Sequence, residues 1–79
     1  MSPAVATALV GYAVAAPFVL WIPLFKRMWH APDARLLVLH ETGVVLIVVG
    51  LAAQGRTPAA AVNAAYGVGV GLARVLARR

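Results

Sequence analysis

The longest uncharged segment of this sequence is its N-terminal one. Residues 1–25 carry no charged side chain, and the next two residues are Lys26 and Arg27. About 20 apolar residues are what one helix needs to cross a bilayer. Because a hydrocarbon core offers no water to bare peptide groups, apolar segments there must be helices closed on their own hydrogen bonds. The segment therefore predicts an all-α protein that lives in lipid.

Composition agrees and argues against catalysis. The 79 residues are 63% hydrophobic, above the roughly 45–50% of a soluble domain. The chain has no cysteine, its only acids are Asp33 and Glu41, and its only serine is Ser2, so nucleophilic chemistry lacks its usual residues. We expect no enzyme and no cofactor, and a function that needs many copies or a larger partner.

Residues 1–79 are expected to form a single small hydrophobic unit of two to three transmembrane-type helices, packed into a helical homopolymer. Ser2 and Pro3 are a typical helix cap and first helical position. The expected helices run over residues of about 3–29, 33–54 and 58–78.

Prolines and one glycine mark the expected irregularities. Pro17 and Pro23 fall inside the first helix, where each removes one backbone hydrogen bond, and a kink or curve rather than a break is expected. Gly55 is expected to stop the second helix in the left-handed conformation. Thr57 and Pro58 repeat the cap and proline of the N-terminus. The third helix is rich in alanine and glycine, and its uncharged run over residues 57–73 is just long enough to cross.

Aromatic and basic residues predict the orientation. Trp21, Phe25 and Trp29 are spaced by four, as in an aromatic belt at headgroup level. Cytoplasmic loops are enriched in lysine and arginine. If the first connection lies on the cytoplasmic side, Arg56 is the only lysine or arginine that falls outside. We therefore expect the N-terminus outside and the C-terminus inside. The basic residues that then fall inside are Lys26, Arg27, Arg35, Arg74, Arg78 and Arg79.

Small residues recur four apart in two of the expected helices. Helices in lipid associate by close backbone approach, which such faces permit. An Ala- and Gly-rich composition also makes these spacings by chance, but we favour specific packing against other helices. The residues are Thr7, Gly11 and Ala15 in the first helix, and Asn63, Gly67 and Gly71 in the third.

His40 and Glu41 are polar neighbours near the start of an apolar helix. An ionisable group inside a membrane segment is expensive and therefore a functional candidate. A proton relay, an axial ligand to a porphyrin, or pairing with Lys26 or Arg27 of a neighbour would each explain them. Structural pairing is the favoured interpretation.

The basic cluster has two interpretations. Lys26, Arg27, His30 and Arg35 are either topology signals that meet lipid phosphates, or, in many copies, a positive lining that guides a nucleic acid. No motif that reads bases is present.

An architecture of apolar helices, a short basic connection and small-residue faces resembles the pilins of conjugation-type secretion systems, and archaeal DNA-import pilins above all. Bacterial conjugative pilins usually carry a long cleaved leader, whereas an apolar helix begins here almost at Met1, which favours the archaeal kind. The resemblance implies a type IV secretion-like, lipid-containing cell-surface filament, assembled from membrane subunits, that carries DNA without sequence-specific binding. It implies lumen or lipid-headgroup contacts at Lys26, Arg27, His30 and Arg35, with Arg56 as the substitute if the other connection faces inward.

Two other classes stay open. A holin-like, pore-forming phage protein would also show short crossings and a basic tail. A small accessory subunit of a membrane complex would use His40 as a possible ligand. The pilin predicts filaments, the holin predicts lysis, and the accessory subunit predicts co-purification with a cofactor-bearing partner.

Overall fold

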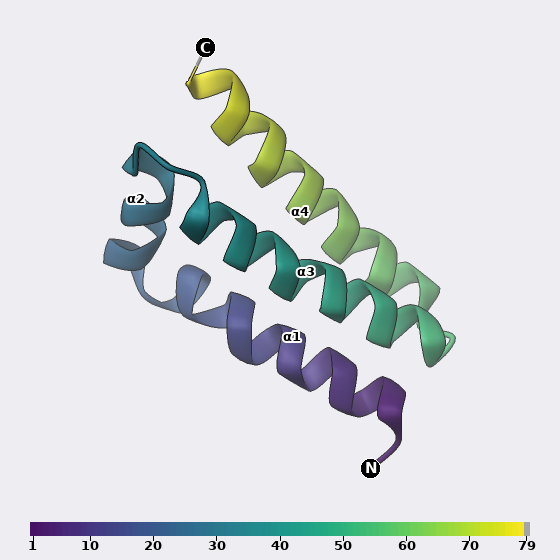
Figure 1. The fold of residues 1–79 in the computed structure, drawn as a ribbon. Helices are drawn as coiled ribbons and strands as arrows, with labels where there is room; N and C mark the ends of the chain where they lie inside the picture. Colours follow the sequence, from purple (N-terminus) through teal and green to yellow (C-terminus); the bar gives the residue numbers. More distant parts are fainter. Residues whose placement is uncertain (79) are drawn as a thin grey trace.

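The described part of the chain forms four helices, and three of them are long and apolar enough to cross a membrane. The computed structural model describes residues 1–78. The three long helices run alternately up and down and form an elongated bundle of 39 × 19 × 17 Å, while the short second helix turns across one end (Figure 1). Their bounds are α1 Pro3–Leu20, α2 Ile22–His30, α3 Arg35–Ala53 and α4 Thr57–Ala77.

The single helix expected over 3–29 is instead two helices, and the expected kink is wrong. Trp21 is extended, with φ −121° and ψ 98°, and separates α1 from α2. Pro23 cannot donate a backbone hydrogen bond, and it takes the second position of α2, where no donor is needed. Pro17 is tolerated inside α1, and its carbonyl still accepts from Trp21 N at 3.0 Å.

The remaining helix ends follow local chemistry. Ser2 caps α1 as expected, its Oγ accepting from Val5 N at 3.2 Å. Asp33 lies before α3 rather than in its first turn, and Asp33 Oδ1 accepts from Arg35 N at 3.1 Å. Gly55 has the expected left-handed φ of 76°. Thr57 is the first residue of α4 instead of its cap, and Pro58 falls within the first two positions.

Helix α3 lies between α1 and α4, and glycines let α1 approach it closely. A Cβ placed on Gly11 would lie 2.6 Å from the Gly43 carbonyl oxygen, and one on Gly50 would lie 2.5 Å from Ala8 N. Both distances are shorter than any real Cβ contact, so only glycine fits. Gly43 and Gly50 are seven residues apart and present one face of α3 to α1.

The α3–α4 contact is built from small residues on α4 and branched ones on α3. A Cβ on Gly67 would lie 2.5 Å from Val44 Cγ1. Ala60 of α4 joins the buried cluster that continues into the α1–α3 contact, whose other members are Ala15, Val44, Ile47 and Leu51.

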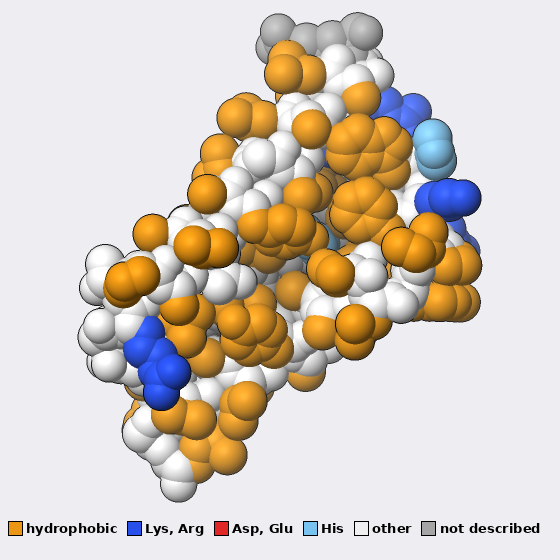
Figure 2. All heavy atoms as spheres, turned by 180° about the vertical axis from the view of Figure 1, so that it is seen from behind, with side chains coloured by type: hydrophobic (Ala, Val, Ile, Leu, Met, Phe, Trp, Pro, Cys, Tyr) orange, Lys and Arg blue, Asp and Glu red, His pale blue; other side chains and the backbone are white. Residues whose placement is uncertain are grey.

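The outer surface is apolar along most of the bundle. Figure 2 shows one face covered by hydrophobic side chains, with lysine and arginine only toward its two ends. Exposed valines and leucines occur on all three long helices, including Val10, Val45 and Leu72. A surface this apolar matches a hydrocarbon environment, so the chain is a membrane protein with transmembrane-type helices.

Candidate functional sites

The basic residues of the first connection gather at one end of the bundle. Arg27, His30 and Arg35 line an open hollow whose apolar part includes Leu24 and Leu36. Lys26 is exposed on α2 but does not line the hollow. The hollow forms because the break at Trp21 lets α2 fold over the end of α3 (Figure 1).

Arg56 lies apart from this cluster. It precedes α4 in the connection between α3 and α4, at the opposite end of the bundle from α2 (Figure 1). The structure thus brings together three of the five predicted headgroup or lumen residues, with Lys26 close by in sequence on α2, and separates Arg56 from them. Lipid or lumen contact by these residues remains a prediction.

Arg74 of α4 fastens α2 to the bundle. Its side chain is only 6% exposed. Arg74 Nε donates to the Met28 carbonyl at 3.2 Å, and Nη2 donates to the carbonyls of Ala31 at 2.6 Å and Asp33 at 3.3 Å. The last carbonyls of a helix lack intrahelical donors and carry partial negative charge, so a buried guanidinium suits them. The Met28 side chain itself is fully buried.

Arg78 continues the same contact one turn further along α4. Its Nη2 donates to the Ala31 carbonyl at 2.6 Å and also to the His30 carbonyl. We call Arg74 and Arg78 together the arginine clamp. Sequence reasoning treated both residues only as topology signals. The signal it missed is their spacing of four, which places two guanidinium groups on one helix face.

A chain of three polar side chains crosses the interior between α3 and α4. His40 is fully buried, with Nδ1 lying 3.1 Å from Glu41 Oε1 and Nε2 lying 2.8 Å from the Tyr66 hydroxyl. Because a carboxylate only accepts, Nδ1–H donates to Glu41, and in the tautomer with the proton on Nδ1 the other ring nitrogen, Nε2, accepts from the Tyr66 hydroxyl. The rings of Phe18 and His40 pack edge to face, with their centroids 5.3 Å apart. We call this set the polar chain.

The polar chain decides what the predicted His40–Glu41 pair can do. Both ring nitrogens of His40 already have hydrogen-bond partners, so ligation of a porphyrin iron would require release of Tyr66 or Glu41. The partner of Glu41 within the chain is His40 itself, and pairing with Lys26 or Arg27 of a neighbour remains a prediction. Tyr66 was missed from sequence, although a tyrosine hydroxyl in an apolar helix usually needs a partner.

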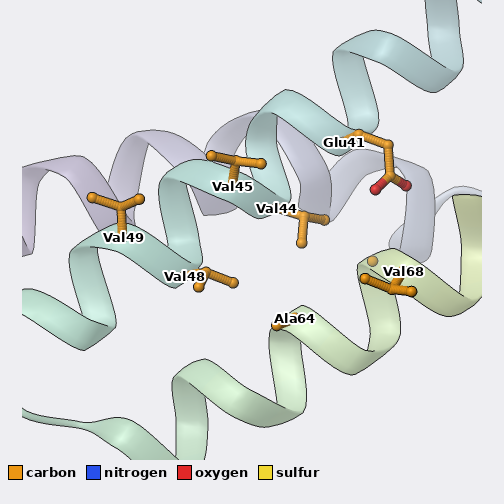
Figure 3. A pocket seen from close by; sticks show the side chains of 8 residues that line it. Glu41, Val44, Val45, Val48, Val49, Ala64 and Val68 are labelled. Carbon is orange, nitrogen blue, oxygen red and sulfur yellow. The ribbon is translucent and has the colours of Figure 1, made fainter.

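A groove between α3 and α4 begins at Glu41. Its volume is about 190 Å³. Figure 3 shows Glu41 reaching from α3 toward α4, with Val44 and Val48 on the same side of α3 and Ala64 and Val68 opposite them. The Glu41 side chain is 32% exposed and provides the one carboxylate of the lining. The remaining lining residues are Val45, Val49 and Gly67.

Most of the predicted small-residue positions lie in contacts between helices of the same chain. Gly11 and Ala15 face α3, and Gly67 faces Val44. Gly71 is looser, because a Cβ there would meet the Glu41 carboxyl at an ordinary 3.7 Å. Asn63 Nδ2 donates to the Ala59 carbonyl at 2.9 Å, within its own helix. In the first helix Ala8 is buried in the contact with α3, where Thr7 was expected.

The fold and these sites define a class: a small all-α membrane protein with a basic end and a buried polar chain. Comparison with protein-family models, with curated proteins and with solved structures finds no match to this chain.

Proposed function

We propose that this chain is the structural subunit of a lipid-containing, conjugation-type filament that serves as a conduit for DNA. In this role copies of the chain pack side by side in lipid, leave the membrane as a cell-surface filament, and direct their basic ends toward phosphate groups. The chain acts as a conduit wall and performs no chemistry.

The observation that carries the proposal is the one-sided distribution of charge. Arg27, His30 and Arg35 converge on one open hollow, while the perimeter of the bundle is apolar. A repeated ring of such ends would produce a continuous positive surface, which lowers the electrostatic cost of a polyanion in a narrow passage. The arginine clamp supports this role because it holds α2 and its cations in place.

Self-association would use the faces that the fold leaves open. The closest glycine contacts, at Gly11, Gly50 and Gly67, are made within the chain. The exposed apolar residues of α4 outside the groove remain available, among them Val62, Val75 and Leu76, as does Gly69, around which nothing lies within 4 Å. Packing in lipid depends on such close apolar contact.

The first test is microscopy of cells that produce the protein, with lipid extraction from the purified material. Filaments that contain both this chain and phospholipid are expected. Discrete particles that hold a cofactor-bearing partner would overturn the proposal in favour of an accessory subunit. Lysis on expression alone, without filaments, would overturn it in favour of a holin.

The second test addresses the conduit. Reversing the charge at Lys26 and Arg27 by substitution with glutamate should reduce DNA transfer by about tenfold or more, with filaments still formed. Arg56→Glu is the matched control, because Arg56 lies at the other end (Figure 1), and it should leave transfer near the wild-type level. Unchanged transfer in the double variant contradicts the role of the basic end.

A further inference from the structure

One oxygen of the Glu41 carboxylate faces the groove without a donor. Oε1 accepts from His40 Nδ1 at 3.1 Å, and no residue of the described part of the chain donates a hydrogen bond to Oε2. Oε2 lies beside Gly67, where a Cβ would be 3.4 Å away. A carboxylate oxygen in a membrane segment costs free energy unless a cation or a donor meets it. The open lone pairs of Oε2 therefore call for a positively charged group.

The rest of the groove sets the shape of that group. Beyond Glu41 every lining side chain is aliphatic, and the volume of about 190 Å³ exceeds the roughly 150 Å³ that suffices for a benzene ring. The carboxylate lies toward one end of the groove, and the valines continue away from it along α3 (Figure 3). A fitting molecule has a charged head and a short apolar body.

We propose that the groove between α3 and α4 binds a small amphiphilic organic cation, with its ammonium head against Glu41 Oε2 and its apolar body along Val44, Val48 and Val68. His40 is a positioning residue, because its bond to Oε1 turns the other oxygen toward α4. This site goes beyond the proposed function, since no step of DNA passage uses it.

The position of Glu41 favours a free cation over a basic residue from a second copy. Glu41 lies six residues after Arg35, which is about 9 Å further along the helix axis. A parallel copy carries Lys26, Arg27 and Arg35 at the level of its end, and its Arg74 is held by backbone carbonyls. What a parallel copy presents near the level of Glu41 is apolar, as at the exposed Val45 and Leu72.

The test uses the full chain in nanodiscs of zwitterionic lipid, titrated with benzyltrimethylammonium and followed by isothermal calorimetry. Saturable binding is expected for the wild type. Glu41→Gln should raise the dissociation constant by about tenfold or more, the equivalent of losing one charge contact. Benzylsulfonate, which has the same ring and the opposite charge, should show no saturable binding.

A second pair of variants keeps the charge and changes the shape. Ala64→Leu fills the groove from α4 and should weaken binding of benzyltrimethylammonium, with the circular dichroism spectrum unchanged. Ala65→Leu, exposed and outside the lining, is the matched control and should bind as the wild type does. Should Glu41→Gln fail to fold, this pair decides the question alone.

Three results would overturn the site. The first is equal affinity of wild type and Glu41→Gln, and the second is equal affinity of the Ala64→Leu and Ala65→Leu variants. The third is absence of saturable binding by the wild type. If Val45→Cys, at the rim of the groove, then forms disulfide dimers in membranes, a second copy is the occupant instead.

Discussion

At the residue scale, the polar chain shows how a membrane bundle accommodates a histidine. His40 is fully buried yet has a partner for each ring nitrogen, and no described side-chain polar atom that is buried lacks one. The imidazole thus joins two helices by a hydrogen bond to Tyr66 that spans 26 positions of sequence. The imidazole therefore provides a hydrogen-bond partner for two other polar groups at once, the Glu41 carboxylate and the Tyr66 hydroxyl.

Replacing His40 by leucine should cost more stability than removing the Tyr66 hydroxyl. His40→Leu leaves two polar groups without a partner, Glu41 Oε1 and the Tyr66 hydroxyl, at an expected cost of about 1–3 kcal/mol each, whereas Tyr66→Phe leaves one, the buried His40 Nε2, at about 1–3 kcal/mol. Unfolding by sodium dodecyl sulfate in mixed micelles, followed by circular dichroism, measures both. A His40→Leu variant as stable as Tyr66→Phe would contradict the bridging role.

Two glycine-to-alanine substitutions separate helix propensity from packing. Alanine favours a helix by about 1 kcal/mol relative to glycine, so Gly69→Ala, with open space around it, should stabilise the protein slightly. Gly11→Ala should destabilise it by about 1–3 kcal/mol, because its Cβ would meet backbone atoms of Gly43 and Ile47 at 2.6 Å. The same unfolding titration measures both variants, and equal effects would disprove the close α1–α3 contact.

At the element scale, α2 depends on α4. Its C-terminal carbonyls are bound by Arg74 and Arg78, and the helix is only nine residues long. An isolated helix of this length is marginal. The arginine clamp is therefore the device that keeps the basic end in its folded position.

Arg74→Gln should loosen α2 without unfolding the three long helices. Glutamine is shorter, uncharged and unable to reach three carbonyls, so the amides of α2 should exchange about tenfold faster with solvent deuterium. Hydrogen exchange followed by mass spectrometry measures the effect. Arg56→Gln at the opposite end is the control and should leave α2 exchange unchanged; an equal change in both variants would refute the clamp.

Local signals predicted the long helices, and tertiary contacts decided the rest. Uncharged length, the Ser2 cap and the left-handed Gly55 are read within a few residues, and each is confirmed. The break at Trp21 is not readable in this way, because Pro17 and Pro23 look alike in sequence, but only Pro23 lies in a helix that the distant Arg74 holds. Likewise His40 was singled out from sequence, whereas its partner Tyr66 follows only from the α3–α4 register.

At the scale of the whole molecule, three antiparallel long helices place two sets of connections at opposite ends (Figure 1). One end holds α2, the connection before α3 and the end of α4, and thus most of the basic residues; the other holds Ser2 and Arg56. Lysine and arginine accumulate on the cytoplasmic side of membrane proteins. The orientation predicted from charge therefore puts the end that holds α2 on the cytoplasmic side and the end that holds Ser2 and Arg56 outside.

Cysteine accessibility tests that orientation directly, because the native chain has no cysteine to interfere. With a membrane-impermeant maleimide on intact cells, before assembly, Ser2→Cys and Thr57→Cys should be labelled from outside. Asp33→Cys should be labelled only after permeabilisation, because it lies in the basic connection. Val45→Cys, on the apolar outer face of α3, is the control that should resist labelling in both conditions. Labelling of Asp33→Cys on intact cells would reverse the orientation, and a mixture of both patterns would mean that the excess of cations at one end is too small to fix it.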